Sequence, residues 1–177
     1  MSISHLSLVN QKLAFAGATI GLLNNSLGEP KGMRKLELQA LADAAVFHLM
    51  MALHFYLREL AEHHQLKKPS VIRSIQDLIS SLQQVDKVSS EASELLALSQ
   101  ISDSWLSQLT QYHDHIFKSP EKPREKKAFG QENLIALVEL TEARGQELPD
   151  LTVELLASWL ESFRALVVRQ RETSAEY

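Results

Sequence analysis

Residues 41–57 constrain the fold of this chain more than any other segment, because they are apolar on nearly every side of a helix. Only Asp43, His48 and His54 interrupt the apolar run. A helix that lacks a polar face is surrounded by other elements rather than placed at a surface. The segment therefore predicts a long, buried second helix, over about Met33 to Gln65, at the centre of a helical protein.

The N-terminal part of the chain has the pattern of a helix that packs on other helices. Its apolar residues recur at alternating steps of three and four, at Leu6, Val9, Leu13, Ala16, Ile20, Leu23 and Leu27. This spacing puts them on one face of a helix over about Ser4–Asn25. Two observations argue against a signal peptide, namely this regular spacing and the absence of a small-residue cleavage site after it. No run of roughly 18 apolar residues exists, so we expect no membrane-spanning helix.

The rest of the chain is also helical in pattern and contains no convincing strand. Breaker residues at 28–32 predict the first turn. Further helices are expected from about Pro69–Ser70 with Ile72, Ile75, Ile79 and Leu82, from a cap at Ser89, from a cap at Ser102 or Asp103 through Trp105, Leu109, Tyr112 and Ile116, over about Gln131–Arg144, and from Pro149–Asp150. These elements predict an all-α, up-and-down helical bundle of five to six helices in a single domain, residues 1–177.

Composition excludes several kinds of chemistry. The chain has no cysteine, which removes disulfides, thiolate nucleophiles, iron–sulfur clusters and cysteine zinc sites. The absence of cysteine also fits a cytoplasmic protein. A net charge of −4 is mild and does not indicate a general nucleic-acid binder.

Charge is concentrated in one predicted loop, residues 118–128. It contains five bases, two acids and two prolines. One interpretation is a basic loop that contacts an anion. The interpretation that we favour is a solvated linker, kept open by its charge and its prolines.

The seven histidines are the main candidates for metal ligands. A carboxylate-bridged di-metal bundle needs Glu-x-x-His pairs, and no glutamate here has a histidine three residues later. His113 and His115 would point about 200° apart on a helix, and the adjacent His63 and His64 have the same fault. We therefore predict no metal and no cofactor, with a mononuclear histidine site between helices as the minor alternative.

The pair Arg58 and His63 resembles the Arg-x4-His pattern of the HEPN ribonucleases, which are small helical bundles. The resemblance implies that these two residues act on the 2′-hydroxyl and the scissile phosphate of RNA. Against it, Glu59 follows the arginine and would repel a phosphate. We favour a solvated helix end, on which His54 and Glu62 share a polar edge with Arg58.

His48 lies in the middle of the most apolar segment, where an imidazole must be hydrogen-bonded to be buried at low cost. We favour a core histidine bound to a partner such as Asn10 or a backbone carbonyl. The alternative is a small-ligand pocket near His48 that Trp105 and Tyr112 help to line.

Several short segments together are similar to a family of uncharacterised gammaproteobacterial proteins, of the pseudomonad type, that is a domain of unknown function. The segments are Asn10-Gln11-Lys12 with Phe15-Ala16-Gly17, Ala45-Val46-Phe47-His48-Leu49, Ser104-Trp105-Leu106, Asn133-Leu134-Ile135-Ala136, and Arg169-Gln170-Arg171 with Glu176. The resemblance spans nearly the whole chain and implies a single-domain cytoplasmic protein. It implies no activity and no catalytic residue. Tyr177 departs from the tryptophan that we associate with the family.

We therefore expect a non-enzymatic helical bundle that binds a protein partner or itself, and neither nucleic acid nor a membrane. The expectation depends on the absence of P-loop, Gly-x-Ser-x-Gly and Gly-x-Gly-x-x-Gly patterns. It also depends on the surplus of apolar residues on the first, second and last predicted helices, which typically marks an interface. Ribonuclease activity and ligand binding stay as the alternative functions.

Overall fold

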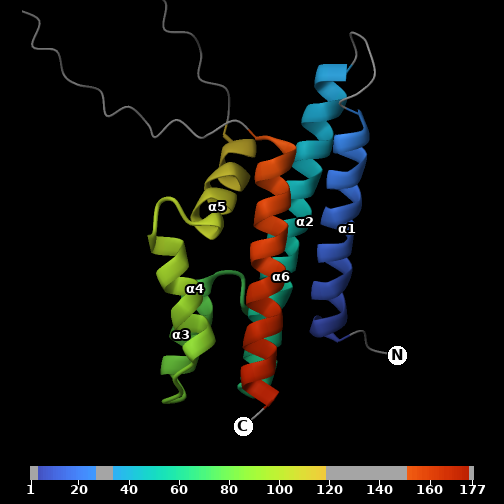
Figure 1. Cartoon of the computed structure of the whole chain (residues 1–177). Helices are drawn as coiled ribbons and strands as arrows, with labels where there is room; N and C mark the ends of the chain where they lie inside the picture. The colour runs from blue at the N-terminus through green and yellow to red at the C-terminus, as the bar shows by residue number, and fades with distance from the viewer. Residues whose placement is uncertain (1–3, 27–33, 119–150, 176–177) are drawn as a thin grey trace, which may run out of the picture.

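The computed structural model describes residues 4–26, 34–118 and 151–175. Within these ranges the chain forms six α-helices and one short 3₁₀ helix, with no strand (Figure 1). The elements are α1 (His5–Ser26), α2 (Arg34–His63), η1 (Pro69–Val71), α3 (Ile75–Gln83), α4 (Ser90–Gln100), α5 (Trp105–Ile116) and α6 (Val153–Ala175). The predicted all-α helical bundle is confirmed. The predicted turn at 28–32, the basic loop beyond Lys118 and the helix at 131–144 lie outside the described residues.

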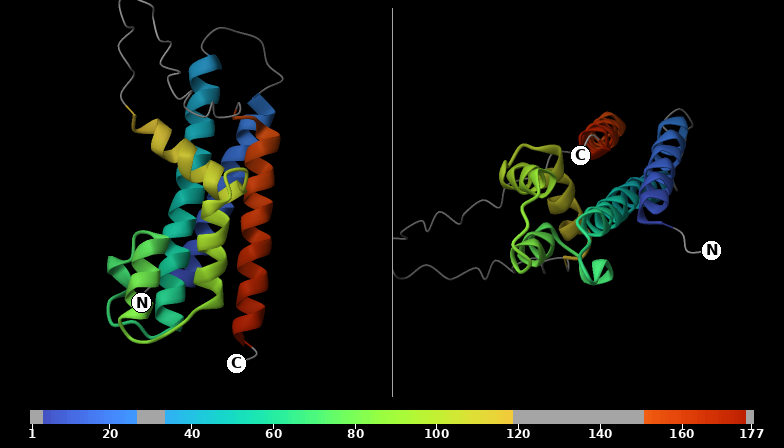
Figure 2. Two further views of the ribbon diagram at one scale, coloured as in Figure 1. Left: turned by 90° about the vertical axis from the view of Figure 1, so that its left-hand side faces the viewer. Right: turned by 90° about the horizontal axis from the view of Figure 1, so that it is seen from below.

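Three long helices, α1, α2 and α6, run along the length of the molecule, and α1 is antiparallel to the other two (Figure 1). The shorter helices α3, α4 and α5 pack on the side of α2 away from α1. Seen from below, α2 lies in the middle of the bundle (Figure 2). It contacts every other described helix, as expected for the predicted central helix.

The core is built from one stripe of each long helix. On α1 the predicted positions Val9, Leu13, Ala16, Ile20 and Leu23 are buried, whereas Leu6 is exposed. The largest fully buried side chains come mainly from α2 and α6 and include Tyr56, Leu49, Leu57, Trp159 and Phe163. Burying a side chain of this size contributes about 1.5–3 kcal/mol, so the contacts around α2 supply much of the stability.

One side of α2 differs from the prediction of a helix buried all round. Phe47 and Met51 are 36% and 37% exposed, although both lie in the most apolar segment. They are four positions apart and therefore share one face of the helix. The neighbouring helices enclose the opposite face of α2 and leave this one open.

Three predicted helix starts need correction. The N-cap of α5 is Ser104, whose Oγ accepts from the Ser107 N–H at 3.0 Å, rather than Ser102 or Asp103. The segment from Pro69 forms only η1, and α3 begins at Ile75 because Ser74 and Asp77 form a capping box. In α6, which begins at Val153, the Thr152 hydroxyl accepts from the Leu155 N–H at 3.2 Å. The serine at 89 caps α4 as predicted.

Two helices are apolar enough to cross a membrane by length and composition alone, His5–Ser26 and Lys35–His63. The expectation of no spanning helix depended on the absence of an uninterrupted apolar run, and average hydropathy gives a different result. Both helices pack against each other in the bundle. The core helix of a soluble protein passes the same test, so this result carries no further conclusion.

The helices α2 and α3 are each followed by a residue with left-handed backbone. Gln65 has a φ of 55° and Asp86 a φ of 52°. After α2, the Leu66 N–H donates to the Ala61 carbonyl at 2.9 Å, which is the long hydrogen bond of a Schellman turn. Glycine is the usual residue at this position because a Cβ disfavours the left-handed backbone by roughly 1–2 kcal/mol.

We therefore expect Gln65→Gly to raise the free energy of unfolding by about 1 kcal/mol, because it removes this backbone strain. Urea unfolding followed by circular dichroism measures the change. Gln11→Gly is the matched control, since Gln11 is an exposed position inside α1, where glycine costs about 1 kcal/mol. An equal loss of stability in both variants would show that the turn carries no such strain.

Candidate functional site

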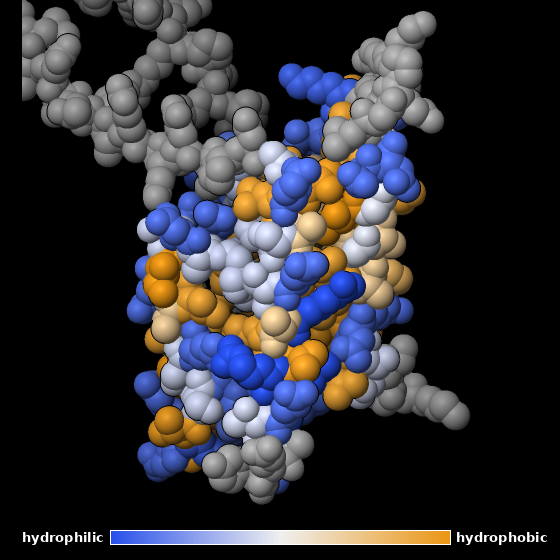
Figure 3. Space-filling model, in the orientation of Figure 1, coloured by the Kyte–Doolittle hydropathy of each residue, from blue (hydrophilic) through white to orange (hydrophobic). Residues whose placement is uncertain are grey.

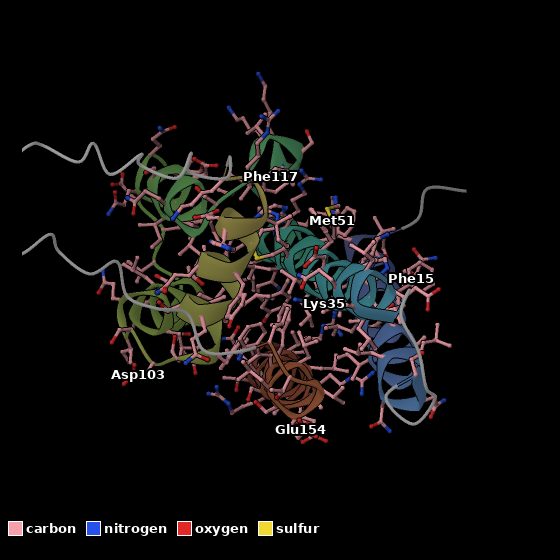
Figure 4. All side chains as sticks on the ribbon, turned by 90° about the horizontal axis from the view of Figure 1, so that it is seen from above. Phe15, Lys35, Met51, Asp103, Phe117 and Glu154 are labelled. Atoms are coloured by element: carbon pink, nitrogen blue, oxygen red, sulfur yellow. The ribbon has the colours of Figure 1, made fainter. Side chains whose placement is uncertain are left out.

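The side of the bundle turned away from α6 carries a cluster of aromatic, histidine and cationic side chains, which we call the aromatic–histidine face. Its members are Lys12 and Phe15 of α1, Phe47, His48, Met51, His54, Phe55 and Arg58 of α2, His113 of α5, and Phe117 directly after α5. In the view from above, Phe117 and Met51 lie on this side, Phe15 lies on the flank of α1, and Glu154 lies on α6 opposite (Figure 4).

The contact between α2 and α5 forms one end of the face. The ring of Phe47 meets those of His113 and Phe117 edge-on, with centroid distances of 5.5 and 5.6 Å. His113 and Phe117 in turn lie 5.1 Å apart. Phe117 remains 67% exposed, so this group of three rings is open to a binding partner on its outer side.

The contact between α1 and α2 forms the other flank. Phe15 packs edge-on against His48 at 5.5 Å, and the Lys12 ammonium lies 5.2 Å from the Phe15 ring centre. Burial, and secondarily the charge of Lys12, lowers the pKa of His48. The predicted place of His48 in the core is wrong, since the side chain is only half-buried. Of the two suggested partners, Asn10 accepts from Arg171 through Oδ1, and a backbone carbonyl stays a prediction.

His54 and Arg58 continue the face along α2, toward the C-terminal end of this helix. The pKa of His54 is lowered by burial first, and then by the positive charges of His113 and Arg58. The Arg58 guanidinium carbon lies 5.7 Å from the Phe55 ring centre, and its Nε donates to the Ile72 carbonyl at 3.1 Å. Arg58 is thus fixed on the face by a ring on one side and a backbone oxygen on the other.

The structure does not bring Arg58 and His63 to a common partner. Five positions separate them on α2, which corresponds to about 140° around the helix. His63 is exposed and packs against the ring of His64 at 5.3 Å, whereas Arg58 binds Ile72. The hypothesis that the two act together on RNA remains a prediction.

His48, Trp105 and Tyr112 do not lie together at a common site. Trp105 stacks on Phe163 at 5.2 Å and Tyr112 packs on Trp159 at 5.5 Å, both in the contact between α5 and α6. His48 lies in the contact between α1 and α2. Ligand binding by these residues remains a prediction. Within the three described ranges, no group of three or more histidine, aspartate or glutamate side chains could hold a metal ion.

A separate polar network ties together the ends of four helices. Arg171 of α6 binds Glu59 of α2 through Nε and Nη2, at 2.7 and 2.8 Å, and donates from Nη1 to Asn10 of α1 at 2.9 Å. The fork of an arginine matches a carboxylate in this two-bond arrangement. Because both groups are largely buried, the pair fixes how α1, α2 and α6 meet.

The same network continues to α4. The buried Tyr56 hydroxyl donates to Gln170 Oε1 at 2.6 Å, and Gln170 Nε2 donates to Glu94 Oε2 at 2.7 Å. Glu94 also pairs with Arg169, which together with Gln170 holds the pKa of this carboxyl below its usual range. Burial raises the pKa of Tyr56. The charged and polar groups of this network therefore hydrogen-bond to one another and join the helices that carry them.

Sequence reasoning identified neither feature by its residues. The apolar surplus of the second helix predicted an interface, but hydropathy did not show that Phe47 and Met51 are its exposed residues. The network joins Asn10 to Arg169, Gln170 and Arg171 across almost the full chain. Asn10 was otherwise considered only as a partner of His48, and Arg169, Gln170 and Arg171 only as parts of a segment that carries the family resemblance.

The lowered pKa of His54 predicts a loss of stability on acidification. The unfolded chain takes up a proton near the ordinary pKa of 6.5, while the folded state resists it, so unfolding becomes easier as the pH falls below 6.5. We expect His54→Gln to reduce the slope of unfolding free energy against pH between about pH 7 and pH 5. Urea titrations at several pH values measure it, and unchanged slopes would contradict the prediction.

The network predicts a strong energetic coupling between Glu59 and Arg171. A double-mutant cycle of Glu59→Gln and Arg171→Gln should give a coupling of about 1–2 kcal/mol, because the pair is bidentate and mostly buried. The Arg169–Glu94 pair is the control. Arg169 is exposed, so water and salt weaken that pair and its coupling should be smaller. Equal coupling energies for the two pairs would show that burial does not determine the strength of the coupling.

Comparison with known proteins assigns the chain to a family through its sequence and not through a similar solved structure. No curated protein and no solved structure matches it significantly. Sequence analysis predicted membership of a domain-of-unknown-function family over nearly the whole chain. A family model described as "Family of unknown function (DUF6586)" matches residues 1–177, and the chain therefore belongs to this family.

Proposed function

We propose that this protein is a non-enzymatic, cytoplasmic helical bundle that binds a protein partner through the aromatic–histidine face. The observation that carries the proposal is the exposure of Phe47, Met51 and Phe117 around the outer side of the central helix. Side chains of this size are usually buried when they lie on a core helix. Their grouping on one face is typical of a surface that another molecule covers.

The kinds of residue on the face support binding of a protein. Aromatic residues, methionine and arginine are enriched at the centres of protein interfaces. Met51 is flexible and polarisable, so it adapts to the shape of a partner. Arg58 and the ring groups are already held in place by their neighbours, which reduces the entropy lost on binding.

On the opposite side of the molecule, around α6, apolar and polar residues both reach the surface, and several apolar residues adjoin one another (Figure 3). Exposed apolar residues are normal for a folded protein, so the proposal depends on the large side chains grouped on the aromatic–histidine face. The proposal does not extend to RNA cleavage, because Arg58 is bound to the Ile72 carbonyl while His63 lies elsewhere on α2.

The test is photo-crosslinking with an unnatural amino acid at position 51, in cells that produce the protein naturally, followed by reconstitution with the purified partner. We expect Met51→Glu and Phe117→Glu each to weaken binding at least tenfold, because each buries a charge in an apolar contact.

Val88→Glu is the matched control, since Val88 is 90% exposed but lies between α3 and α4, away from the face. It should bind the partner as the unaltered protein does. The proposal fails if the partner binds both charged variants of the face normally, or if crosslinking at position 51 yields no protein partner.

A further inference from the structure

We propose that the partner segment covering the aromatic–histidine face is an acidic amphipathic helix. This inference rests on the proposed function and names the chemistry of the partner. It depends on the distribution of charge around the face, on the length of the face along α2, and on the side chains that border it.

The middle of this face carries cations but no carboxylate, although the chain has a net charge of −4. The helix α1 contains no aspartate or glutamate, and α2 contains none between Asp43 and Glu59. The cations Lys12 and Arg58 lie within that region, each against an aromatic ring. A partner that carries carboxylates beside its apolar residues would complement these charges.

The histidines add hydrogen-bond donors to the same face. His48, His54 and His113 are half-buried, and His48 and His113 pack edge-on against Phe15 and Phe47. An imidazole has at least one N–H to donate. Three acids border the face at its edges. Asp43 lies one turn before Phe47 on α2, Asp114 Oδ1 lies 3.7 Å from His113 Nδ1, and Glu62 pairs with His5 at 2.7 Å, one turn beyond Arg58. Carboxylates are thus lacking at the middle of the face, where a partner's acidic groups would lie.

The length of the face fits a helix. From Phe47 to Arg58 the face extends along α2 for about 16 Å, or three helical turns. An amphipathic helix presents apolar residues at i, i+3 or i+4, and i+7, which span about two turns. Phe15 on the α1 side and Phe117 on the α5 side would contact the flanks of such a helix.

Charge also argues against two other occupants. In a two-fold dimer through this face, the same surface meets itself, so the second copy would bring no carboxylate to the middle of the face, where Lys12 and Arg58 lie. A membrane-binding face is usually rich in lysine and arginine. Here only Lys12 and Arg58 lie on the face, and the Nε of Arg58 already donates to the Ile72 carbonyl.

The test uses the full chain and two synthetic peptides of about 18 residues with the same leucines at i, i+3, i+4 and i+7. One peptide has glutamate at every polar position and the other has lysine. Titration calorimetry should show at least tenfold tighter binding of the glutamate peptide, and Met51→Glu should abolish that binding.

Charge reversal on the protein provides the matched variants. Lys12→Glu should weaken binding of the glutamate peptide and strengthen binding of the lysine peptide. Lys67→Glu, an exposed position after the end of α2, should change neither. Circular dichroism of each variant shows whether the bundle is still folded.

Equal or tighter binding of the lysine peptide, still sensitive to Met51→Glu, would overturn the acidic partner while leaving the proposed function intact. Failure of both peptides to bind would also overturn this inference, and the crosslinking test would then decide the proposed function separately. Light scattering that shows a dimer broken by Met51→Glu would identify a second copy as the occupant. Binding to vesicles of anionic phospholipid that Met51→Glu abolishes would identify a membrane, and either result would overturn the inference.

Discussion

The burial of one side of α2 is the interaction on which the rest of the structure depends. Tyr56, Leu49 and Leu57 are buried on that side, and every other described helix contacts α2. A helix with apolar residues all round can meet neighbours in any direction, so its own sequence does not specify which side they cover. The neighbours decide this, because α1 and α6 each have a single apolar stripe and must bury it. The side of α2 that they leave uncovered becomes the exposed aromatic surface.

Hydrophobic packing alone would leave the rotation and sliding of these helices weakly specified, since apolar contacts have little directionality. The polar network supplies the missing direction at one end of the bundle. Arg171 can satisfy Glu59 and Asn10 together only when α1, α2 and α6 meet in one register. A misplaced helix would leave a largely buried charge without its partner, which is costly. The network therefore selects the arrangement in which the face opposite α6 stays open.

Features of the fold that depend on neighbouring residues could be predicted from the sequence, whereas features that depend on contacts between distant helices could not. Helix periodicity is local, and it correctly predicted α1, α2, α5 and the central place of α2. Capping depends on which of several adjacent polar residues reaches the first turn, so Ser104 was missed in favour of Ser102 or Asp103. Exposure of Phe47 and Met51 depends on helices distant in sequence, and hydropathy alone could not separate them from the core residues beside them. The Glu59–Arg171 pair has the same non-local origin.

The outer and inner sides of α2 can vary in sequence independently of each other. On α2, positions four apart share a face, so Phe47, Met51 and Arg58 point outward while Leu49, Tyr56 and Leu57 point inward. Substitutions on the outer side change the surface chemistry without creating a cavity, and those on the inner side remove core volume. The two sides are therefore separable although they belong to one helix. The packed inner side holds the backbone of α2 in a fixed place, so a small number of outward-facing side chains can determine what binds.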